Sequence, residues 1–107
     1  MNRAATDAVT LFMLVKANRS WLSASVEERQ RNISTFLTPL LARYRGALTL
    51  RYFDTEFYSA RISDIWMWEA ASHAVWQAFT EALRDTPFWN DFFEIKEILQ
   101  GVEAQHL

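Results

Sequence analysis

The run ISDIWMWEA holds the strongest candidate for chemistry, Asp64, which precedes Trp66 and Trp68 by two and four residues. If this run is a β-strand, its side chains alternate between two faces, and Asp64 shares a face with both tryptophans. Aromatic neighbours would withdraw the carboxyl from water, raise its pKa and make it a candidate general base. The alternative is an Asp64 without catalytic role at a strand end, in water or paired with Arg51 or Arg61.

His73 is the second candidate, because imidazole acts as an acid, a base or a metal ligand near neutral pH. It follows Ser72 at the start of a predicted helix, close to the positive end of the helix dipole. That position disfavours a charged imidazole, and a surface histidine without a role is the alternative. We therefore name Asp64 and His73 as the candidate catalytic residues.

Other side chains could bind and orient a ligand rather than react with it. Arg51 and Tyr52 lie on a predicted strand and offer donors for a carbonyl or phenolate oxygen. Trp66, Trp68 and Trp89 could line a flat apolar pocket suited to an aromatic or polycyclic ligand. The alternative for the tryptophans is that they fill a dimer interface.

The composition argues against several classes of function. The net charge is −2 and the arginines are scattered among acids, so no basic stripe is present for a nucleic acid. The chain has no cysteine and only two glycines, which excludes thiolate metal sites and a glycine-rich phosphate loop. We expect no metal site and no membrane span. A chain without cysteine also fits the reducing cytoplasm, where we expect this protein.

The first half of the chain predicts a strand followed by a helix. The nearly unbroken apolar run at residues 9–16 has the length of a strand buried on both faces. Ser25 and Glu28 have the spacing of a capping box that begins a helix. Gly46 is placed to end that helix in a left-handed conformation. Pro39 interrupts the helical pattern, so we expect a bend there, with a break into two helices as the alternative.

The second half predicts two strands, a helix and a last strand. Residues 48–53 alternate between apolar and polar types, and residues 60–70 resume that pattern after a long connection. Ser72 caps the second helix, a short turn follows Thr86 and Pro87, and residues 92–99 form the last strand.

The predicted element order, β-α-β-β-α-β, is that of the ferredoxin-like α+β fold. In this fold a four-stranded antiparallel sheet carries both helices on one face. At 107 residues we expect one domain, residues 1–107, with flexible ends at 1–7 and 102–107.

A second chain is expected because the predicted strands are apolar on both faces. Two helices cover only one face of such a sheet, and a monomer would expose the other. The economical solution is a homodimer whose two sheets pack face to face as a dimeric α+β barrel, with ~800 Å² buried per chain.

Three stretches carry a resemblance to a known family: VTLFMLVKANRSWLSASVEERQ, RYFDTEFYSARISDIWMWEA and DTPFWNDFFEIKEILQGVE. They resemble the darcynin family, within the dimeric α+β-barrel superfamily. The most distinctive pieces are Trp21-Leu22 ahead of the capped helix and Thr86-Pro87-Phe88-Trp89 ahead of the last strand. The resemblance implies the fold and a homodimer, and it implies no particular activity for darcynins.

The wider superfamily includes cofactor-free monooxygenases, polyketide cyclases, muconolactone isomerase-like enzymes and haem-binding enzymes. Its haem-degrading members pair a strand tryptophan and a helix histidine with an asparagine on the first strand. Trp66 and His73 match two of these, but residues 9–16 contain no asparagine. We therefore expect no cofactor, and haem in particular is disfavoured.

Two hypotheses of function remain. The first is a small dimeric, cofactor-independent enzyme that acts on an aromatic or polyketide-like compound. In it Asp64 or His73 moves a proton, Arg51 and Tyr52 orient oxygen atoms, and the tryptophans form the walls. The second is a non-catalytic dimer that binds a small apolar ligand or has a purely structural role. The residues alone do not decide whether the protein is an enzyme.

Overall fold

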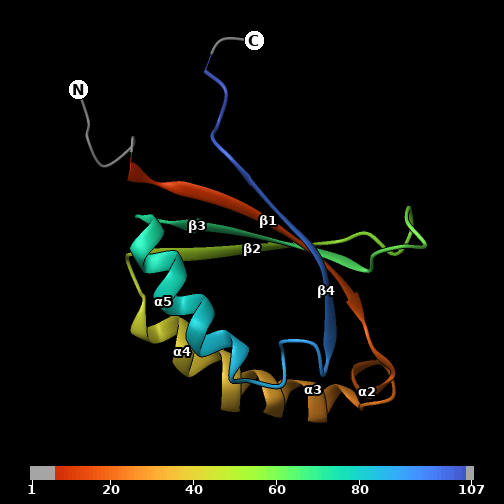
Figure 1. Cartoon of the computed structure of the whole chain (residues 1–107). Helices are drawn as coiled ribbons and strands as arrows, with labels where there is room; N and C mark the ends of the chain where they lie inside the picture. The colour runs from red at the N-terminus through yellow and green to blue at the C-terminus, as the bar shows by residue number, and fades with distance from the viewer. Residues whose placement is uncertain (1–6, 106–107) are drawn as a thin grey trace.

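A four-stranded antiparallel sheet covered by helices on one face makes up the computed structural model, which describes residues 7–105 (Figure 1). The elements in chain order are β1 (Val9–Ala17), α2 (Arg19–Leu22), α3 (Val26–Asn32), the π-helical turn η1 (Ile33–Leu37), α4 (Thr38–Arg43), β2 (Leu48–Asp54), β3 (Asp64–Ala70), α5 (His73–Arg84) and β4 (Phe93–Gly101). The strand order is β2-β3-β1-β4, and each neighbouring pair is antiparallel. The predicted ferredoxin-like α+β fold is confirmed.

Several boundaries differ from the predictions. Trp21 and Leu22, which precede the capped helix, belong to a separate helical turn, α2, that was not predicted. The third strand begins at Asp64 rather than at residue 60, and β4 extends to Gly101. Of the predicted flexible ends, 1–7 and 102–107, residues 1–6 and 106–107 lie outside the described part of the chain. Residues 102–105 follow β4 without a helix or strand.

The first helical segment begins as its sequence predicts. The backbone N–H of Glu28 donates to the Ser25 hydroxyl at 3.1 Å, and the backbone N–H of Ser25 donates to the Glu28 carboxylate at 3.0 Å. These two bonds satisfy backbone donors that the start of a helix leaves free. They also lower the pKa of the Glu28 carboxyl, with the bond from the Ser25 backbone as the largest cause. Gly46 has φ +85°, the left-handed conformation expected of it after the helix.

The helical run continues through Pro39 without a break, but one turn of it is π-helical rather than α-helical. α3, η1 and α4 follow one another without a gap from residue 26 to residue 43. Pro39 has no N–H to donate to the carbonyl of Thr35, and the turn before it widens so that the Thr38 N–H donates to the Ile33 carbonyl, five residues back. The wide turn presents Ile33 and Leu37 toward the sheet.

The core lies between the sheet and the helices. Trp68, Phe79 and Met13 are almost completely buried there, and the Trp68 and Phe79 rings are 4.9 Å apart. Phe79 comes from α5, which is capped by Ser72 as predicted: the Val75 N–H donates to the Ser72 hydroxyl. Among residues 7–105, no helix is long and apolar enough to cross a membrane.

The opposite face of the sheet carries apolar side chains that no helix covers. Phe12, Phe53 and Leu99 are exposed by 36%, 43% and 45% in the single chain. Phe12 pairs with Met67 of β3 on one side and with Leu99 of β4 on the other, so these side chains adjoin. One chain by itself therefore does not bury both faces of its sheet.

Candidate functional site

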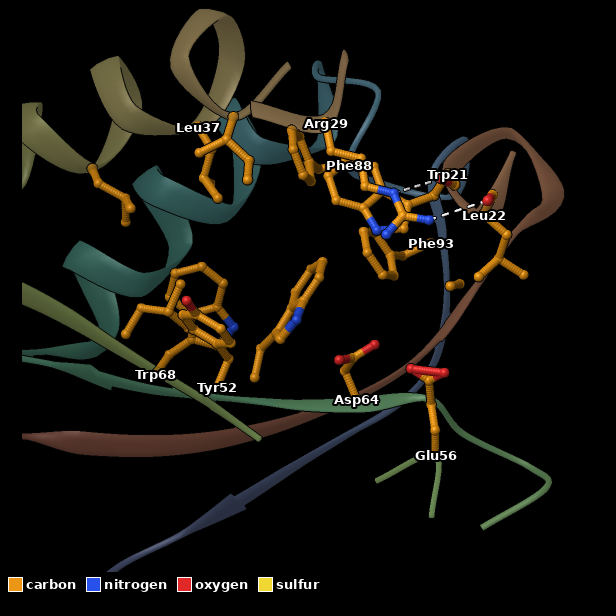
Figure 2. A pocket seen from close by; sticks show the side chains of 15 residues that line it. Trp21, Leu22, Arg29, Leu37, Tyr52, Glu56, Asp64, Trp68, Phe88 and Phe93 are labelled. Atoms are coloured by element: carbon orange, nitrogen blue, oxygen red, sulfur yellow. Dashed lines mark hydrogen bonds between the residues drawn. The ribbon is translucent and has the colours of Figure 1, made fainter. Parts of the chain in front are cut away.

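A cavity of about 390 Å³ separates the strands from the helical run (Figure 2). Its walls come from β1, β2, β3 and β4, from the helical segments α2 to α4, and from two connecting loops. The lining residues are Ala17, Trp21, Leu22, Arg29, Ile33, Leu37, Leu41, Leu50, Tyr52, Glu56, Asp64, Trp66, Trp68, Phe88 and Phe93. Most of this lining is apolar, and the charged side chains in it are Arg29, Glu56 and Asp64.

Aromatic rings form much of the cavity wall and are held by contacts with one another. Trp66 meets Phe93 at 4.8 Å in an edge-to-face arrangement and lies 6.4 Å from Trp68 at 88°. Trp21, from α2, packs 5.1 Å from Phe93 and 5.5 Å from Phe88. Such pairs favour fixed ring orientations, so the cavity has flat, preformed walls.

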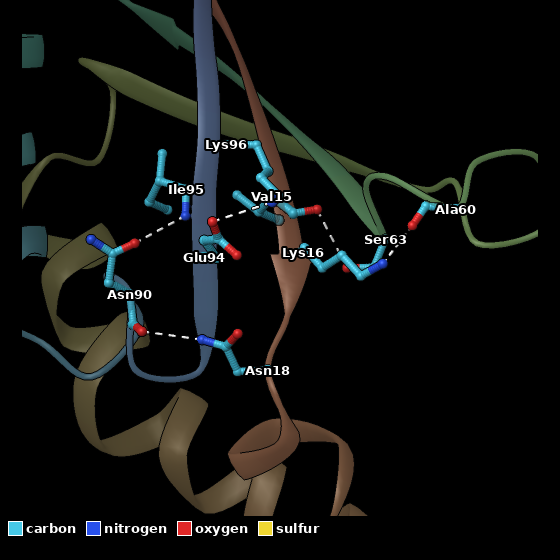
Figure 3. Close-up of polar contacts among 9 residues, drawn as sticks. All are labelled: Val15, Lys16, Asn18, Ala60, Ser63, Asn90, Glu94, Ile95 and Lys96. Carbon is cyan, nitrogen blue, oxygen red and sulfur yellow. Dashed lines mark hydrogen bonds and ion pairs between the residues drawn. The ribbon is translucent and has the colours of Figure 1, made fainter.

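Asp64 is placed by hydrogen bonds that join the start of β3 to β1. The backbone N–H of Ser63 donates to the Val15 carbonyl at 2.9 Å, and the N–H of Ala17 donates to the Ser63 hydroxyl at 2.8 Å. The Ser63 hydroxyl donates to Asp64 Oδ2 at 2.7 Å. A further bond, from the Lys16 ammonium to the Ala60 carbonyl, holds the preceding loop against the same strand (Figure 3).

The pKa of Asp64 is raised above that of an ordinary aspartate. The main cause is desolvation by the surrounding side chains, and the nearby Asp54 carboxylate adds to it. Asp54 is the register partner of Asp64 on the neighbouring strand β2. The hydrogen bond from Ser63 acts in the opposite direction and lowers the pKa, but it does not cancel the rise.

Arg29 lies across the cavity from Asp64, on the helical side (Figure 2). Its Nε donates to the Trp21 carbonyl at 3.0 Å, and its Nη2 donates to the Leu22 carbonyl at 3.1 Å. The guanidinium carbon is 5.5 Å from the centre of the Trp21 ring. Glu56 stands beside Asp64 on the strand side in Figure 2.

The structure brings together four of the residues that the sequence suggested for the site. Asp64, Tyr52, Trp66 and Trp68 all line the cavity. Trp68 is buried in its floor, whereas Tyr52 is 73% exposed.

Three other suggested residues are not in the cavity lining. Arg51 points to the opposite face of the sheet, where its guanidinium lies 5.3 Å from the Phe53 ring. His73 is exposed at the first turn of α5, and Trp89 packs under the Arg84 guanidinium at 5.6 Å.

Arg29 and Trp21 are lining residues that sequence reasoning did not assign to the site. One signal could have found Arg29, because it stands four residues before Ile33 and eight before Leu37, in line with the apolar stripe of the helix. A charged residue inside such a stripe faces the interior and calls for an explanation there. Trp21 is a distinctive residue of the sequence, but nothing in its local sequence indicates which cavity it lines.

The sequence matches the profile of the family described as "Darcynin, domain of unknown function" over residues 2–107. The chain belongs to the darcynin family. A darcynin homologue from Granulibacter bethesdensis is 48% identical over 96 residues, which span 90% of this chain and 77% of that protein. Another, from Streptomyces avermitilis, is 44% identical over 95 residues, 89% of this chain and 78% of its own.

Solved structures similar to this darcynin include chlorite dismutases. That of Candidatus Nitrospira defluvii in complex with imidazole superposes with a TM-score of 0.75 at 14% identity, over 99% of this chain and 43% of the other. A dimeric chlorite dismutase from Nitrobacter winogradskyi gives 0.71 at 15% identity, over 97% of this chain and 61% of the other. This chain thus spans only part of each neighbour, and at such identities the likeness shows the fold alone.

The cavity of this darcynin offers no histidine to coordinate a haem iron. His73 is exposed and absent from the lining, and no lining residue is a histidine. Within residues 7–105 there is also no cluster of three or more metal-ligating His, Cys, Asp or Glu side chains. The residues described do not fit a histidine-ligated haem in this cavity, and the expectation of a cofactor-free protein stays a prediction.

Proposed function

We propose that this darcynin binds a small, planar, largely apolar molecule in the cavity, and that Asp64 exchanges a proton with it. The observation that carries the proposal is a half-buried carboxyl with a raised pKa set among aromatic walls. The volume of about 390 Å³ lies within the range of small-molecule sites, roughly 300 to 1,000 Å³. An aromatic or polyketide-like compound has the shape and polarity of this space.

The hydrogen bonds around Asp64 suit a proton acceptor. The Ser63 hydroxyl engages Oδ2, which fixes the carboxyl and leaves Oδ1 for a ligand. A base is most effective when its pKa lies near the working pH, and desolvation moves the pKa of Asp64 in that direction. Tyr52, at the exposed part of the lining, is placed to donate to an oxygen atom of the ligand.

The alternative is a protein that binds a ligand in the same cavity without transforming it. Asp64→Asn distinguishes the two, because an amide keeps the shape and the bond from Ser63 but cannot accept a proton as a carboxylate does. An enzyme should lose turnover and keep its affinity for the ligand, whereas a binding protein should show little change in affinity and no reaction to lose.

Native mass spectrometry of the purified protein, followed by denaturing analysis, is the first experiment. A releasable small molecule supplies the ligand for the Asp64→Asn comparison, and Asp85→Asn, an exposed carboxylate at the end of α5, is the matched control. If no aromatic compound of this size copurifies or binds, the proposal of a ligand cavity fails. If Asp64→Asn and Asp85→Asn turn over a ligand equally well, Asp64 is not the base.

We further propose a homodimer in which two copies pack their open sheet faces together. The support is the uncovered apolar surface around Phe12, Phe53 and Leu99, which a second copy would bury. The dimeric neighbour from Nitrobacter winogradskyi makes a pair of such domains plausible for this fold.

Phe12→Glu should give a monomer by light scattering at micromolar concentration. Val26→Glu, an exposed apolar residue on the helical side, should leave the mass unchanged. A monomeric wild type would refute the dimer. The cytoplasm stays the expected location.

A further inference from the structure

Arg29 is an arginine held in a fixed place at the cavity wall. Its Nε and Nη2 donate to two successive backbone carbonyls, those of Trp21 and Leu22, and its guanidinium lies over the Trp21 ring. These contacts tie α3 to α2 and set the direction of the guanidinium plane. A side chain fixed in this way presents its remaining N–H groups without a further loss of conformational freedom.

The charge of Arg29 has no carboxylate partner within the described residues. No Asp or Glu oxygen of residues 7–105 lies within 4.0 Å of the guanidinium, and the ion pair found in that range joins Lys96 to Glu94. A partly buried cation without a counter-charge is costly, and a guanidinium has five N–H donors, of which the two carbonyls engage two.

One buried donor of a lining residue has no acceptor in the described part of the chain. The indole Nε1–H of Trp68 is buried and has no hydrogen-bond partner in the described chain. Trp68 belongs to the lining, as Arg29 does. Because this nitrogen has almost no accessible surface, a ligand in the cavity would not reach it. The donors that such a ligand could meet are the remaining N–H groups of Arg29.

The acidic side chains stand on the other side of the space. Figure 2 shows Asp64 and Glu56 along the strand side and Arg29 along the helical side. The cavity is therefore polarised, with a cation at one wall and carboxyl groups at the other. A ligand that matches it carries its acceptor toward α3 and a group that can give up a proton toward β3.

We propose that the ligand is an aromatic oxyanion, a planar ring system bearing a carboxylate or an equivalent charged oxygen, and that Arg29 binds that oxygen. The proposal rests on the proposed function, because it assigns the ligand class of the same cavity. Hydrogen bonds between a guanidinium and an oxyanion are charge-assisted and directional, so Arg29 selects for charge as well as position.

The test compares three probes that share one ring system: 2-naphthoate, the neutral 2-naphthalenemethanol and the cationic 2-naphthylmethylammonium. Their binding to the full chain is measured by calorimetry and by quenching of tryptophan fluorescence. We expect wild type to bind 2-naphthoate about tenfold more tightly than the alcohol, in line with a charge-assisted hydrogen bond. Arg29→Met should remove that preference and leave the affinity for the alcohol unchanged.

Arg31→Met is the matched control, because Arg31 is an exposed arginine of the same helix and does not line the cavity. Arg29→Lys keeps the charge and guards against a fold that fails without Arg29; it should retain part of the preference for 2-naphthoate. Equal affinity of wild type for the acid and the alcohol, or tighter binding of the ammonium probe, overturns the oxyanion proposal while leaving the ligand cavity in place. If none of the three probes binds, the proposed function fails and this inference fails with it.

Discussion

Narrowing the cavity from its helical wall should make the protein more stable and weaken ligand binding. Leu37 ends η1 and lines the cavity, and Leu37→Phe adds three carbon atoms that point into it (Figure 2). At about 0.8 kcal/mol per buried carbon the upper bound of the gain is roughly 2.4 kcal/mol. The ordering of the larger ring and its poorer helix propensity reduce this, so we expect about 1 kcal/mol.

A gain of that size should raise the melting temperature by about 4 °C in a domain of this length. Thermal unfolding followed by circular dichroism measures it, and titration with 2-naphthoate should show binding weakened at least about tenfold by loss of space. Thr35→Phe, at an exposed position of the same π-helical turn, is the control and should change neither quantity much. A lower melting temperature together with unchanged binding for Leu37→Phe would refute the assignment of an open, ligand-sized cavity at this wall.

Three further substitutions test how the site and the fold are held. The pKa of the Asp64 carboxyl is higher in the folded protein than in the unfolded chain. The contribution of Asp64 to the free energy of unfolding is therefore fully present below the unfolded pKa of about 4, and it is lost as the pH rises through the folded pKa. Asp64→Asn should therefore exceed wild type in urea resistance at about pH 7 and lose that advantage near pH 4; the reverse trend would contradict the raised pKa. Ser25→Ala should cost about 1 kcal/mol through the lost cap of α3, and an unchanged urea midpoint would show that the cap is not needed. Phe79→Ala should cost about 3 to 5 kcal/mol in the same assay, unless Trp68 and Trp76 close over the space, in which case the loss stays small.

The fold could be predicted because its main signals are local. Ser25 with Glu28, Ser72 before α5 and the left-handed Gly46 each depend on residues a few positions away, and the structure has them as predicted. The start of β3 could not be placed in the same way. It is decided by bonds from Ser63 to β1, a strand almost fifty residues earlier in the chain, and no local pattern reports such a contact.

The residues of the candidate site were predictable only where the alternation of side chains along one strand places them on the same face. Asp64, Trp66 and Trp68 share a face for that reason, and all three line the cavity. Arg51 and Tyr52 were both suggested as ligand-binding residues, yet neighbours on a strand point to opposite faces. One of the two had to point away from the cavity, and only the position of the helices decides which one does.

The π-helical turn at Ile33–Leu37 also makes the cavity sensitive to insertions and deletions in this segment. A π-helical turn holds one residue more than an α-helical turn over the same hydrogen-bonded span. Deleting a residue within it would restore a regular α-helix and rotate everything before it by about 100° relative to α4. Arg29 would then leave the cavity wall although its own codon was untouched. The number of residues in this turn therefore decides whether the positive charge of Arg29 lies at the cavity wall. Relatives that differ here by a single residue should differ in the ligands they bind.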